Sequence, residues 1–467
     1  MTISTGPASV DATSQGILRM AAPLVISFWM RSLFTFVDTI YASTLGDASV
    51  AAIGLSIPFE FLMIAVWVGL STGLTSNIAR AMGARQGEMV EQYLAVTWRL
   101  VVAVVPIFAA IGGACWFLAP MLSPSTETAH QFAIYAVVLI GGSAFSTFWA
   151  VIPDSIVKAH GDTRATMWAG IWSNVINVAL NTIFTFVFHW GIFGIAVSTV
   201  IGRFGGLAYA LRKARAHQNA WKASGVARMT GLDPTPYRAI LALAAPAALA
   251  YGLIASESGI VNFFLAGLPQ GTESIAAYAI HYRVLQFVLM PAIATAVAML
   301  PFAARRFGEN DAAGIRAGLR QAHLAGLVYV GVAAPILFIG AGPLANALTT
   351  SPITGQLATF GIRVIPLACL VSMPLFLCRP VFEGLGRGKP GLVMAFLRYA
   401  VLIVPAAWLG IRIARALGDP GLYGMIGGQV IAAALSSAAI LLWTRSLFGR
   451  RQSVVEAARG AAAGGSA

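Results

Sequence analysis

The sequence predicts an all-α membrane protein whose twelve transmembrane helices form two six-helix lobes. Hydrophobic residues make up 58% of the 467 residues and charged residues only 10%, whereas a soluble domain carries roughly 25% charged residues. Apolar runs long enough to cross about 30 Å of hydrocarbon as a helix recur along almost the whole chain. An internal repeat divides these runs into two halves. Most of the chain is therefore expected to lie in lipid.

The predicted spans fall into two groups of six, separated by a polar and basic stretch. The first group covers residues 18–41, 49–76, 95–120, 130–153, 166–188 and 191–211, and the second covers 239–264, 274–300, 321–345, 356–379, 391–412 and 421–444. We accordingly divide the chain into an N-terminal tail (1–17), a first lobe (18–211), a linker (212–238), a second lobe (239–445) and a C-terminal tail (446–467).

The formal net charge of +13 comes mostly from loops on one side of the predicted membrane. Lysines and arginines gather before the first span and in every second loop after it, and the alternate loops hold almost none, with Arg412 and Arg415 as the exception. Cytoplasmic loops carry such an excess of basic residues. We expect a multi-pass protein of the cell inner (plasma) membrane with both termini in the cytoplasm. The basic charge is interpreted as a topology signal and not as a nucleic-acid site.

The internal repeat has an offset of 223 to 225 residues. Its four landmarks are Pro23 and Pro246 at an offset of 223, and Ala51 with Ala276, Gly83 with Gly308, and Gly161 with Gly386 at 225. Six spans are an even number, so the two halves enter the membrane in the same orientation and are parallel repeats. Transporters of this build bind their substrate at the interface between the repeats.

Four segments carry a family resemblance that runs over nearly the whole chain. They read FVDTIYASTLGDASVAAIGLSIP, GLSTGLTSNIARAMGARQGE, AHGDTRATMWAGIWSNVINVALN, and GLGRGKP followed by LRYAVL. In their order and spacing they resemble the multidrug and toxic compound extrusion (MATE) transporters of the multidrug/oligosaccharide-lipid/polysaccharide exporter superfamily. The resemblance implies two six-helix lobes around a central cavity, alternating access, and export driven by a proton or sodium gradient.

Asp38 is the first candidate for the coupling site. An ionisable side chain in a lipid-embedded helix costs on the order of 3 kcal/mol, so it is a functional hypothesis by default, and the short stem of Asp38 does not let it reach the interface. Its carboxylate could load and release a proton or offer oxygen ligands to sodium. The resemblance implies that this aspartate binds the coupling ion. The alternative is a structural aspartate that accepts hydrogen bonds at a helix end.

The resemblance also implies a partner site in the fifth and sixth spans, which here consists of Asn177, Asn181 and Thr199. Asn177 and Asn181 are one turn apart and share a helical face. Relatives usually carry Asp at the place of Asn181, and Asn cannot titrate. Asp38 would therefore act with amides and hydroxyls alone, and the choice between proton and sodium stays open. The alternative for these three residues is hydrogen bonding between helices.

Further polar residues inside spans are candidates for the substrate cavity. Glu60 follows Pro58 in the second span, and Glu257 in the seventh span stands roughly where the resemblance places an essential glutamate. Phe34 and Tyr278 could stack on flat compounds, although most aromatic residues serve packing or the membrane interface.

Six arginines lie inside spans. They are Arg31, Arg203, Arg283, Arg363, Arg379 and Arg398. Of these, we assign Arg31 and Arg283 to the cavity. If at least three lined it, the cavity field would be positive and would favour anionic or zwitterionic substrates. The alternative is that each arginine neutralises a nearby acid or a helix C-terminus.

The sequence thus favours a secondary active exporter of organic and xenobiotic small molecules, acting as a monomer. The alternative in the same superfamily is a flippase or exporter for a lipid-linked or anionic precursor, for which the arginines argue, while twelve spans instead of fourteen favour the first function. An enzyme or receptor would need a catalytic constellation or a sizeable soluble domain, and the sequence shows neither. An ATP-driven pump or intramembrane enzyme lacks support because the sequence contains no Walker motif, HExxH or nucleophile elbow. The histidines show no metal-ligand spacing, and we expect no cofactor besides the coupling proton or sodium ion.

Overall fold

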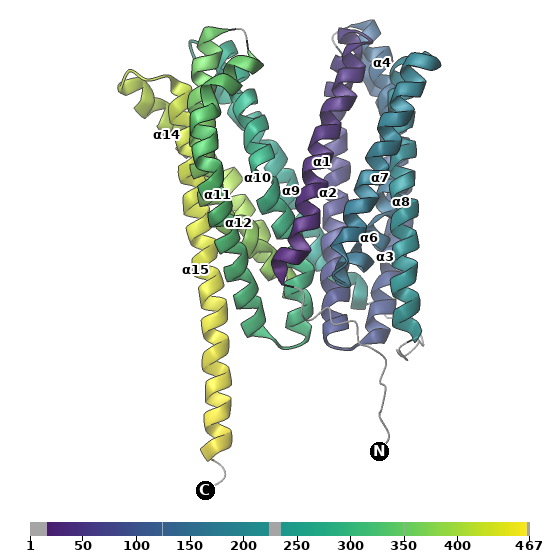
Figure 1. Cartoon of the computed structure of the whole chain (residues 1–467), viewed down its shortest axis with the longest axis vertical. Coiled ribbons are helices and arrows are strands. Elements are labelled where there is room, and N and C mark those ends of the chain that lie inside the picture. The colour runs from purple at the N-terminus through teal and green to yellow at the C-terminus, as the bar shows by residue number, and fades with distance from the viewer. Residues whose placement is uncertain (1–15, 124, 224–234, 350, 465–467) are drawn as a thin grey trace. The chain divides into compact units, whose positions relative to one another are not determined.

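The computed structural model describes residues 16–123, 125–223, 235–349 and 351–464, and every regular element in these ranges is a helix (Figure 1). The side chains of residues 31–40, 43, 47, 223, 255, 256, 258, 259 and 448–464 lie outside this description.

The first six predicted spans coincide with six helical segments. These are α1 (Ile17–Ser43), α2 (Asp47–Gly83), α3 (Gly87–Leu122), a fourth segment made of α4 (Thr126–Ala136), η2 (Val137–Gly141), α5 (Gly142–Trp149) and α6 (Val151–Ala159), a fifth made of α7 (Thr163–Thr182) and η3 (Ile183–Val187), and α8 (Gly191–Ala223). The elements η2 and η3 are π-helical turns, which widen an α-helix by one residue and often occur at functional sites.

The remaining six spans are formed in the same way. They are α9 (Thr235–Ala266), α10 (Gly271–Gly308), α11 (Ala312–Leu348), α12 (Pro352–Gly384), an eleventh segment made of α13 (Lys389–Phe396), η4 (Leu397–Leu402) and α14 (Ile403–Ala416), and α15 (Gly421–Gly464). Among the described residues, eleven of the twelve segments are long and apolar enough to cross a membrane, and α1 contributes the shorter apolar stretch Ile17–Met30. The prediction of an all-α protein with twelve spans is confirmed.

Large apolar side chains cover the outer faces of these helices. Phe117 on α3 is 80% exposed, Phe263 on α9 is 78% exposed and Ile339 on α11 is 77% exposed. Soluble monomers rarely expose extended apolar patches, whereas helices in lipid satisfy their backbone groups internally and turn apolar side chains outward. The exposed apolar surface therefore fits a membrane-embedded chain.

The repeat in the sequence is also a repeat of backbone geometry. Gly161 and Gly386, in the turns that precede α7 and α13, have φ angles of 77° and 79°, a left-handed conformation that glycine adopts without steric cost. Arg85 and Asn310, again 225 residues apart, have φ angles of 58° and 59° after α2 and α10. Equivalent turns in the two halves thus end equivalent helices in the same way.

The chain divides into two compact units. Unit 1 comprises Met1–Gly252, Ile293–Asn310 and Glu383–Lys389, and unit 2 comprises Leu253–Ala292, Asp311–Phe382 and Pro390–Ala467. Unit 1 therefore contains α9 up to Gly252 and the last turns of α10 in addition to α1–α8. The lobe boundaries taken from the sequence stay a prediction.

The helices reach further than the predicted lobes at both ends of the linker, where α9 already begins at Thr235, and in the C-terminal tail. Residues 212–223, assigned to the linker by the sequence, continue α8, because this stretch contains no glycine or proline and is rich in strong helix formers. Residues 446–464, assigned to the C-terminal tail, similarly continue α15.

Candidate functional site

Two glycines on α8 let it approach α7 closely in unit 1. A Cβ atom at Gly202 would lie 2.5 Å from the Ser173 carbonyl oxygen and 3.0 Å from the Asn177 Cβ, and one at Gly206 would lie 2.8 Å from the Ala169 carbonyl oxygen. Membrane helices use small residues at such interfaces because backbones can then approach each other. The close approach places polar side chains of α7 and α8 within hydrogen-bonding distance.

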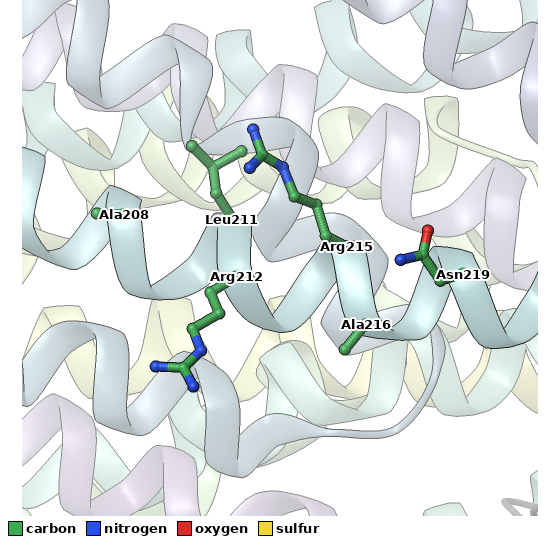
Figure 2. Close-up of a pocket in the computed structure, with 6 residues that line it drawn as sticks. All are labelled: Ala208, Leu211, Arg212, Arg215, Ala216 and Asn219. Carbon is green, nitrogen blue, oxygen red and sulfur yellow. The ribbon is translucent and has the colours of Figure 1, made fainter.

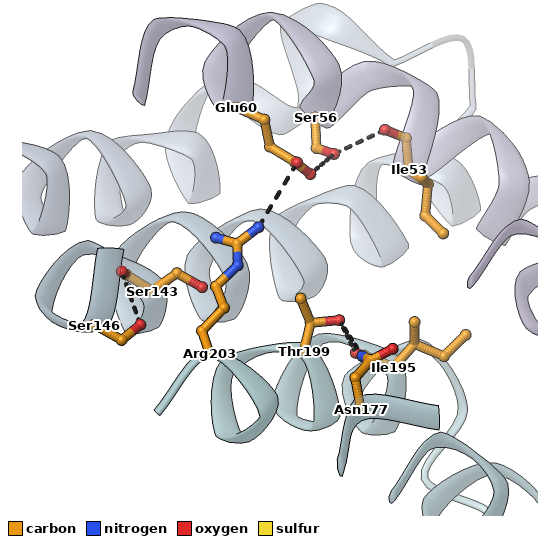
Figure 3. A network of polar contacts seen from close by, with 9 residues as sticks. All are labelled: Ile53, Ser56, Glu60, Ser143, Ser146, Asn177, Ile195, Thr199 and Arg203. Carbon is orange, nitrogen blue, oxygen red and sulfur yellow. Dashed lines mark hydrogen bonds and ion pairs between the residues drawn. The ribbon is translucent and has the colours of Figure 1, made fainter. Parts of the chain in front are cut away.

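We call Asn177, Asn181, Ser198 and Thr199 the α7–α8 cluster. The Asn177 amide donates to the Thr199 hydroxyl over 2.9 Å, and the Ser198 hydroxyl donates to the Asn181 side-chain oxygen (Figure 3 shows Asn177 with Thr199). Asn181 is fully buried and Asn177 is 6% exposed. The structure thus brings the three predicted partner residues Asn177, Asn181 and Thr199 to one place, and adds Ser198. Their role in binding an ion stays a prediction.

α1 packs against α7 beside this cluster. The Tyr41 hydroxyl lies 2.6 Å from the Thr182 hydroxyl, and the Tyr41 ring lies 5.7 Å from that of Phe186. Asp38 lies one turn before Tyr41 in α1. The side chains of Asp38, and of Arg31 and Phe34 on the same helix, fall outside the described residues, so their assignments stay predictions.

A second polar contact in unit 1 joins α2 to α8. The Arg203 guanidinium lies 4.0 Å from the Glu60 carboxylate, and the Ser56 hydroxyl lies 3.5 Å from the same carboxylate (Figure 3). Both charged side chains are about a quarter exposed, at 27% and 26%. Arg203 follows Thr199 by one helical turn, so the Glu60–Arg203 pair and the α7–α8 cluster use the same face of α8. For Arg203, the structure favours the alternative in which an arginine within a span neutralises a nearby acid.

Unit 2 contains a polar cluster of its own, called the unit 2 cluster below, in which hydrogen bonds join Glu257, Tyr278 and Gln429 and the charge of Arg398 acts on Glu257 and Tyr278 through space. The Gln429 amide donates to the Glu257 carboxylate over 3.1 Å and to the Tyr278 hydroxyl over 3.0 Å. Tyr278 is only 4% exposed. The structure therefore brings together two predicted cavity residues, Glu257 and Tyr278. Gln429 was missed, and the signal that could have identified it is an amide side chain within the apolar twelfth span.

Arginines within the spans of unit 2 differ in their surroundings. Arg283 is exposed on α10, and the exposed Arg363 stacks 5.0 Å from the Phe338 ring centroid. Arg398, at the start of η4, lies 5.1 Å from the Tyr399 ring centroid, and its Nε and Nη1 atoms are enclosed by protein. The positive cavity lined by at least three of the six arginines stays a prediction.

The two units place their polar residues on repeat-related spans. In unit 1 they come from the first, second, fifth and sixth spans (α1, α2, α7 and α8), and in unit 2 from the seventh, eighth, eleventh and twelfth (α9, α10, η4 and α15). The third and fourth spans of each half contribute none of the residues named in these contacts, although the fourth span holds a buried ion pair of its own between Asp154 and Lys158.

Two other features carry less functional chemistry. A surface hollow of about 480 Å³ is lined from α8 alone (Figure 2), by Ala208, Leu211, Arg212, Arg215, Ala216 and Asn219. Because no second element supplies a converging polar group to this lining, it lacks the few precisely placed polar groups of a ligand pocket. Within the described part of the chain, no group of three or more His, Cys, Asp or Glu side chains could hold a metal ion.

A chain of twelve apolar helices in two repeats, with polar residues buried inside its spans, belongs to the class of multi-pass membrane transporters. The MatE family model matches residues 23–183 and 246–409, one match in each half. The chain therefore belongs to the MATE family and is a transporter, not an enzyme.

Individual relatives and a solved structure agree with this assignment. The chain is 23% identical over 440 residues to the multidrug export protein MepA of Staphylococcus saprophyticus, covering 92% of both chains. It is 23% identical over 414 residues to the FAD transporter of Shewanella oneidensis, covering 84% of this chain and 87% of the relative. A crystal structure of MATE in complex with MaL6 superimposes with a TM-score of 0.83 at 22% identity, covering 94% of this chain and 96% of the other. The predicted two-lobed fold class is thereby confirmed.

Proposed function

We propose that the protein is a secondary active exporter of organic compounds and that it couples their efflux to the entry of a proton or sodium ion at a site formed by α1, α7 and α8. The observation that carries this proposal is the buried α7–α8 cluster, in which Asn177 and Asn181 are hydrogen-bonded to hydroxyls of the next helix. Amide and hydroxyl oxygens are ligands that a hard cation accepts. Multidrug export by the relative MepA supports the substrate class.

Asp38 supplies the charge in this proposal. The cluster residues on α7 and α8 are all neutral, so a cation bound beside them needs a carboxylate from elsewhere, because an uncompensated charge in the membrane is costly. α1 contacts α7 through Tyr41 and Thr182, and Asp38 precedes Tyr41 by one turn. A bound ion drives the lobes from one state to the other only by the difference in its affinity for the two states, so Asp38 must gain or lose contacts during transport.

The test is gradient-driven efflux of ethidium from energised membrane vesicles, with the proton and sodium gradients collapsed separately. We expect Asp38→Asn to abolish driven efflux and Asn177→Ala to reduce it at least tenfold, the effect of losing about 1.4 kcal/mol of ion binding. Asn219→Ala, at an exposed position of α8 beyond the cluster, is the matched control and should transport normally. Unimpaired driven efflux by Asp38→Asn would remove Asp38 as the coupling site.

We further infer that the protein acts as a monomer in the inner membrane with both termini in the cytoplasm. Arg80 in the last turn of α2, Arg85 just after it, and Arg305 and Arg306 in the last turn of α10 supply the basic charge expected of cytoplasmic loops. A single cysteine introduced at Arg306 should react with a membrane-impermeant maleimide only in inside-out vesicles. Labelling from the outside of intact cells would reverse the proposed topology.

A second candidate function is the export of an anionic precursor. Arg398 favours it, because this cation lies within the eleventh span with enclosed nitrogen atoms, and because a relative at 23% identity is an FAD transporter, whose substrate carries two phosphates. Efflux of carboxyfluorescein against ethidium separates the two functions. Strict preference for the cationic dye would exclude this second candidate.

A further inference from the structure

We propose that the unit 2 cluster is a binding site for a carboxylate or phosphate group of the transported compound. In this site Arg398 binds the anion, and Glu257 balances part of the charge of Arg398 when no anion is bound. This inference rests on the proposed export function and specifies the chemistry of the substrate. Four residues from four different segments form the site: Glu257 of α9, Tyr278 of α10, Arg398 of η4 and Gln429 of α15.

The position of Arg398 is the first observation. It lies nine residues after the start of the eleventh span at Lys389, which is about 13 Å at 1.5 Å per residue. Arginines near the end of a span reach the interface with their long side chains, but the Nε and Nη1 atoms of Arg398 are enclosed by protein. These two nitrogen atoms are thus shielded from the surroundings of the helix.

The second observation is that these two donors are unsatisfied. Nε and Nη1 have no hydrogen-bond partner among the described residues. The guanidinium carbon lies 5.1 Å from the centre of the Tyr399 ring. A cation–π contact with the face of a ring does not accept the hydrogen bonds that these N–H groups could donate in the plane of the guanidinium. A guanidinium is charged at every relevant pH and presents a planar fork of donors that matches carboxylate and phosphate oxygens. Buried donors without acceptors cost about 1–3 kcal/mol each, and more when charged, so an acceptor group is the natural occupant.

The third observation concerns the acid that could have filled this role. Glu257 attracts Arg398 electrostatically, yet these two described side chains form no direct ion pair, and the Glu257 carboxylate instead accepts from Gln429 over 3.1 Å. Gln429 in turn uses its second N–H on the Tyr278 hydroxyl. This network holds the carboxylate away from the guanidinium. It balances the charge of Arg398 through space, while Nε and Nη1 of Arg398 keep no acceptor among the described residues.

The two charged residues should therefore have opposite effects on an anion. Arg398→Gln removes the anchor and should weaken anion binding at least tenfold, because charge-assisted hydrogen bonds are worth about 1.5–3 kcal/mol. Glu257→Gln removes the repulsion between the carboxylate and an incoming anion while keeping a hydrogen-bond acceptor for Gln429, so it should tighten binding about tenfold at an effective dielectric constant near 20. Arg398→Lys keeps the charge without the planar fork and should give intermediate affinity.

The experiment is equilibrium binding of carboxyfluorescein and, by competition, of inorganic phosphate to the whole purified protein in phosphatidylcholine nanodiscs. Arg412→Gln, at an exposed arginine stacked on Trp408 in the same span, is the matched control and should bind like the wild type. Size-exclusion profiles verify that each variant is folded. Unchanged binding by Arg398→Gln, or weaker binding by Glu257→Gln, would overturn the assignment.

Two further arms separate this inference from other outcomes. The binding measurement is repeated in nanodiscs in which about a third of the lipid is phosphatidylglycerol. If carboxyfluorescein binds the protein much more weakly in these nanodiscs, an anionic lipid headgroup occupies the site, and this result would overturn a site for a solute. Asp38→Asn should bind the dye normally while losing driven efflux, since binding needs no gradient. A protein that binds the dye through Arg398 but never exports any compound would refute the proposed function and leave the anion site in place.

Discussion

The ends of α2 and α10 cross within unit 1 at a pair of repeat-related glycines, and this crossing leads to a quantitative prediction. A Cβ atom on Gly83 would fall well inside 3.0 Å of the Arg305 carbonyl oxygen, and one on Gly308 would fall as close to the Arg80 carbonyl oxygen and 2.8 Å from the Ala84 nitrogen. All of these neighbours are backbone atoms. Because a backbone has no alternative rotamer, an added methyl group must push the two helices apart.

We expect Gly83→Ala and Gly308→Ala each to lower the free energy of unfolding by about 1–3 kcal/mol, the usual cost of overpacking. This range is net of the gain of up to about 1 kcal/mol that alanine brings to a helix. A single separation of the helices relieves both overlaps. The double variant should therefore lose about as much stability as one single variant, and not the sum of the two, as expected for residues that share one backbone shift.

The measurement is unfolding by SDS in mixed micelles, followed by tryptophan fluorescence. The control is Gly113→Ala on α3, where no atom lies within 4 Å of the added Cβ, so this variant should be neutral or more stable by about 0.5–1 kcal/mol. Additive losses in the double variant would show that the two glycines act independently. An equal loss in Gly113→Ala would show that the crossing is not the cause.

Three further predictions concern ionisable side chains in unit 1. Burial lowers the pKa of His160, which lies between the fourth and fifth spans, from 6.5 to about 4. The unfolded chain therefore binds more protons below pH 6.5, and the free energy of unfolding should fall by about 2 kcal/mol between pH 7.5 and 5. In SDS titrations His160→Phe should show a smaller fall, and a fall equal to that of the wild type would show that His160 is not the cause. A hydrogen bond from His217 holds the pKa of Asp162 below its usual value. The resulting contribution to the free energy of unfolding is complete above the unfolded pKa of 3.8 and is lost as the pH falls through the lowered value. Acid unfolding of His217→Phe, followed by circular dichroism, should therefore begin at a higher pH than that of the wild type. A double-mutant cycle of Glu60→Gln and Arg203→Gln should give a coupling free energy of no more than about 1 kcal/mol, because the two side chains are 4.0 Å apart and partly exposed. A coupling free energy above about 3 kcal/mol would contradict this and would indicate a closer, buried ion pair.

The sequence was sufficient for the spans because their signal is local. Lipid requires long apolar helices, so hydropathy alone located all twelve segments, and the offset between Gly161 and Gly386 reappears in their nearly equal φ angles. It did not indicate the π-helical turns such as η4. One extra residue per turn leaves the apolar composition unchanged, and the turn is decided by packing against neighbouring helices.

The candidate sites differ in how far sequence reasoning could reach. Asn177 and Thr199 lie on consecutive spans that form a hairpin, so their convergence followed from spacing together with the family resemblance. Gln429 and Glu257 are 172 positions apart, and their contact depends on how α9 and α15 pack in unit 2. No local pattern records such a contact, although each polar residue within an apolar span was visible as an exception to be explained.

The same energetic reasoning distinguishes two arginines that lie within spans, Arg203 and Arg398. Arg203 is 4.0 Å from Glu60 and partly exposed, so much of its cost is offset by its partner and by solvent. Arg398 has two enclosed donors without an acceptor among the described residues, and the carboxylate of Glu257 is hydrogen-bonded to Gln429. A charge in a span costs on the order of 3 kcal/mol, and no described side chain of unit 2 forms an ion pair with Arg398 that recovers this cost. An anion that arrives with the substrate would recover it, and this is why Arg398 is the first of the six arginines to substitute when the charge of the substrate is tested.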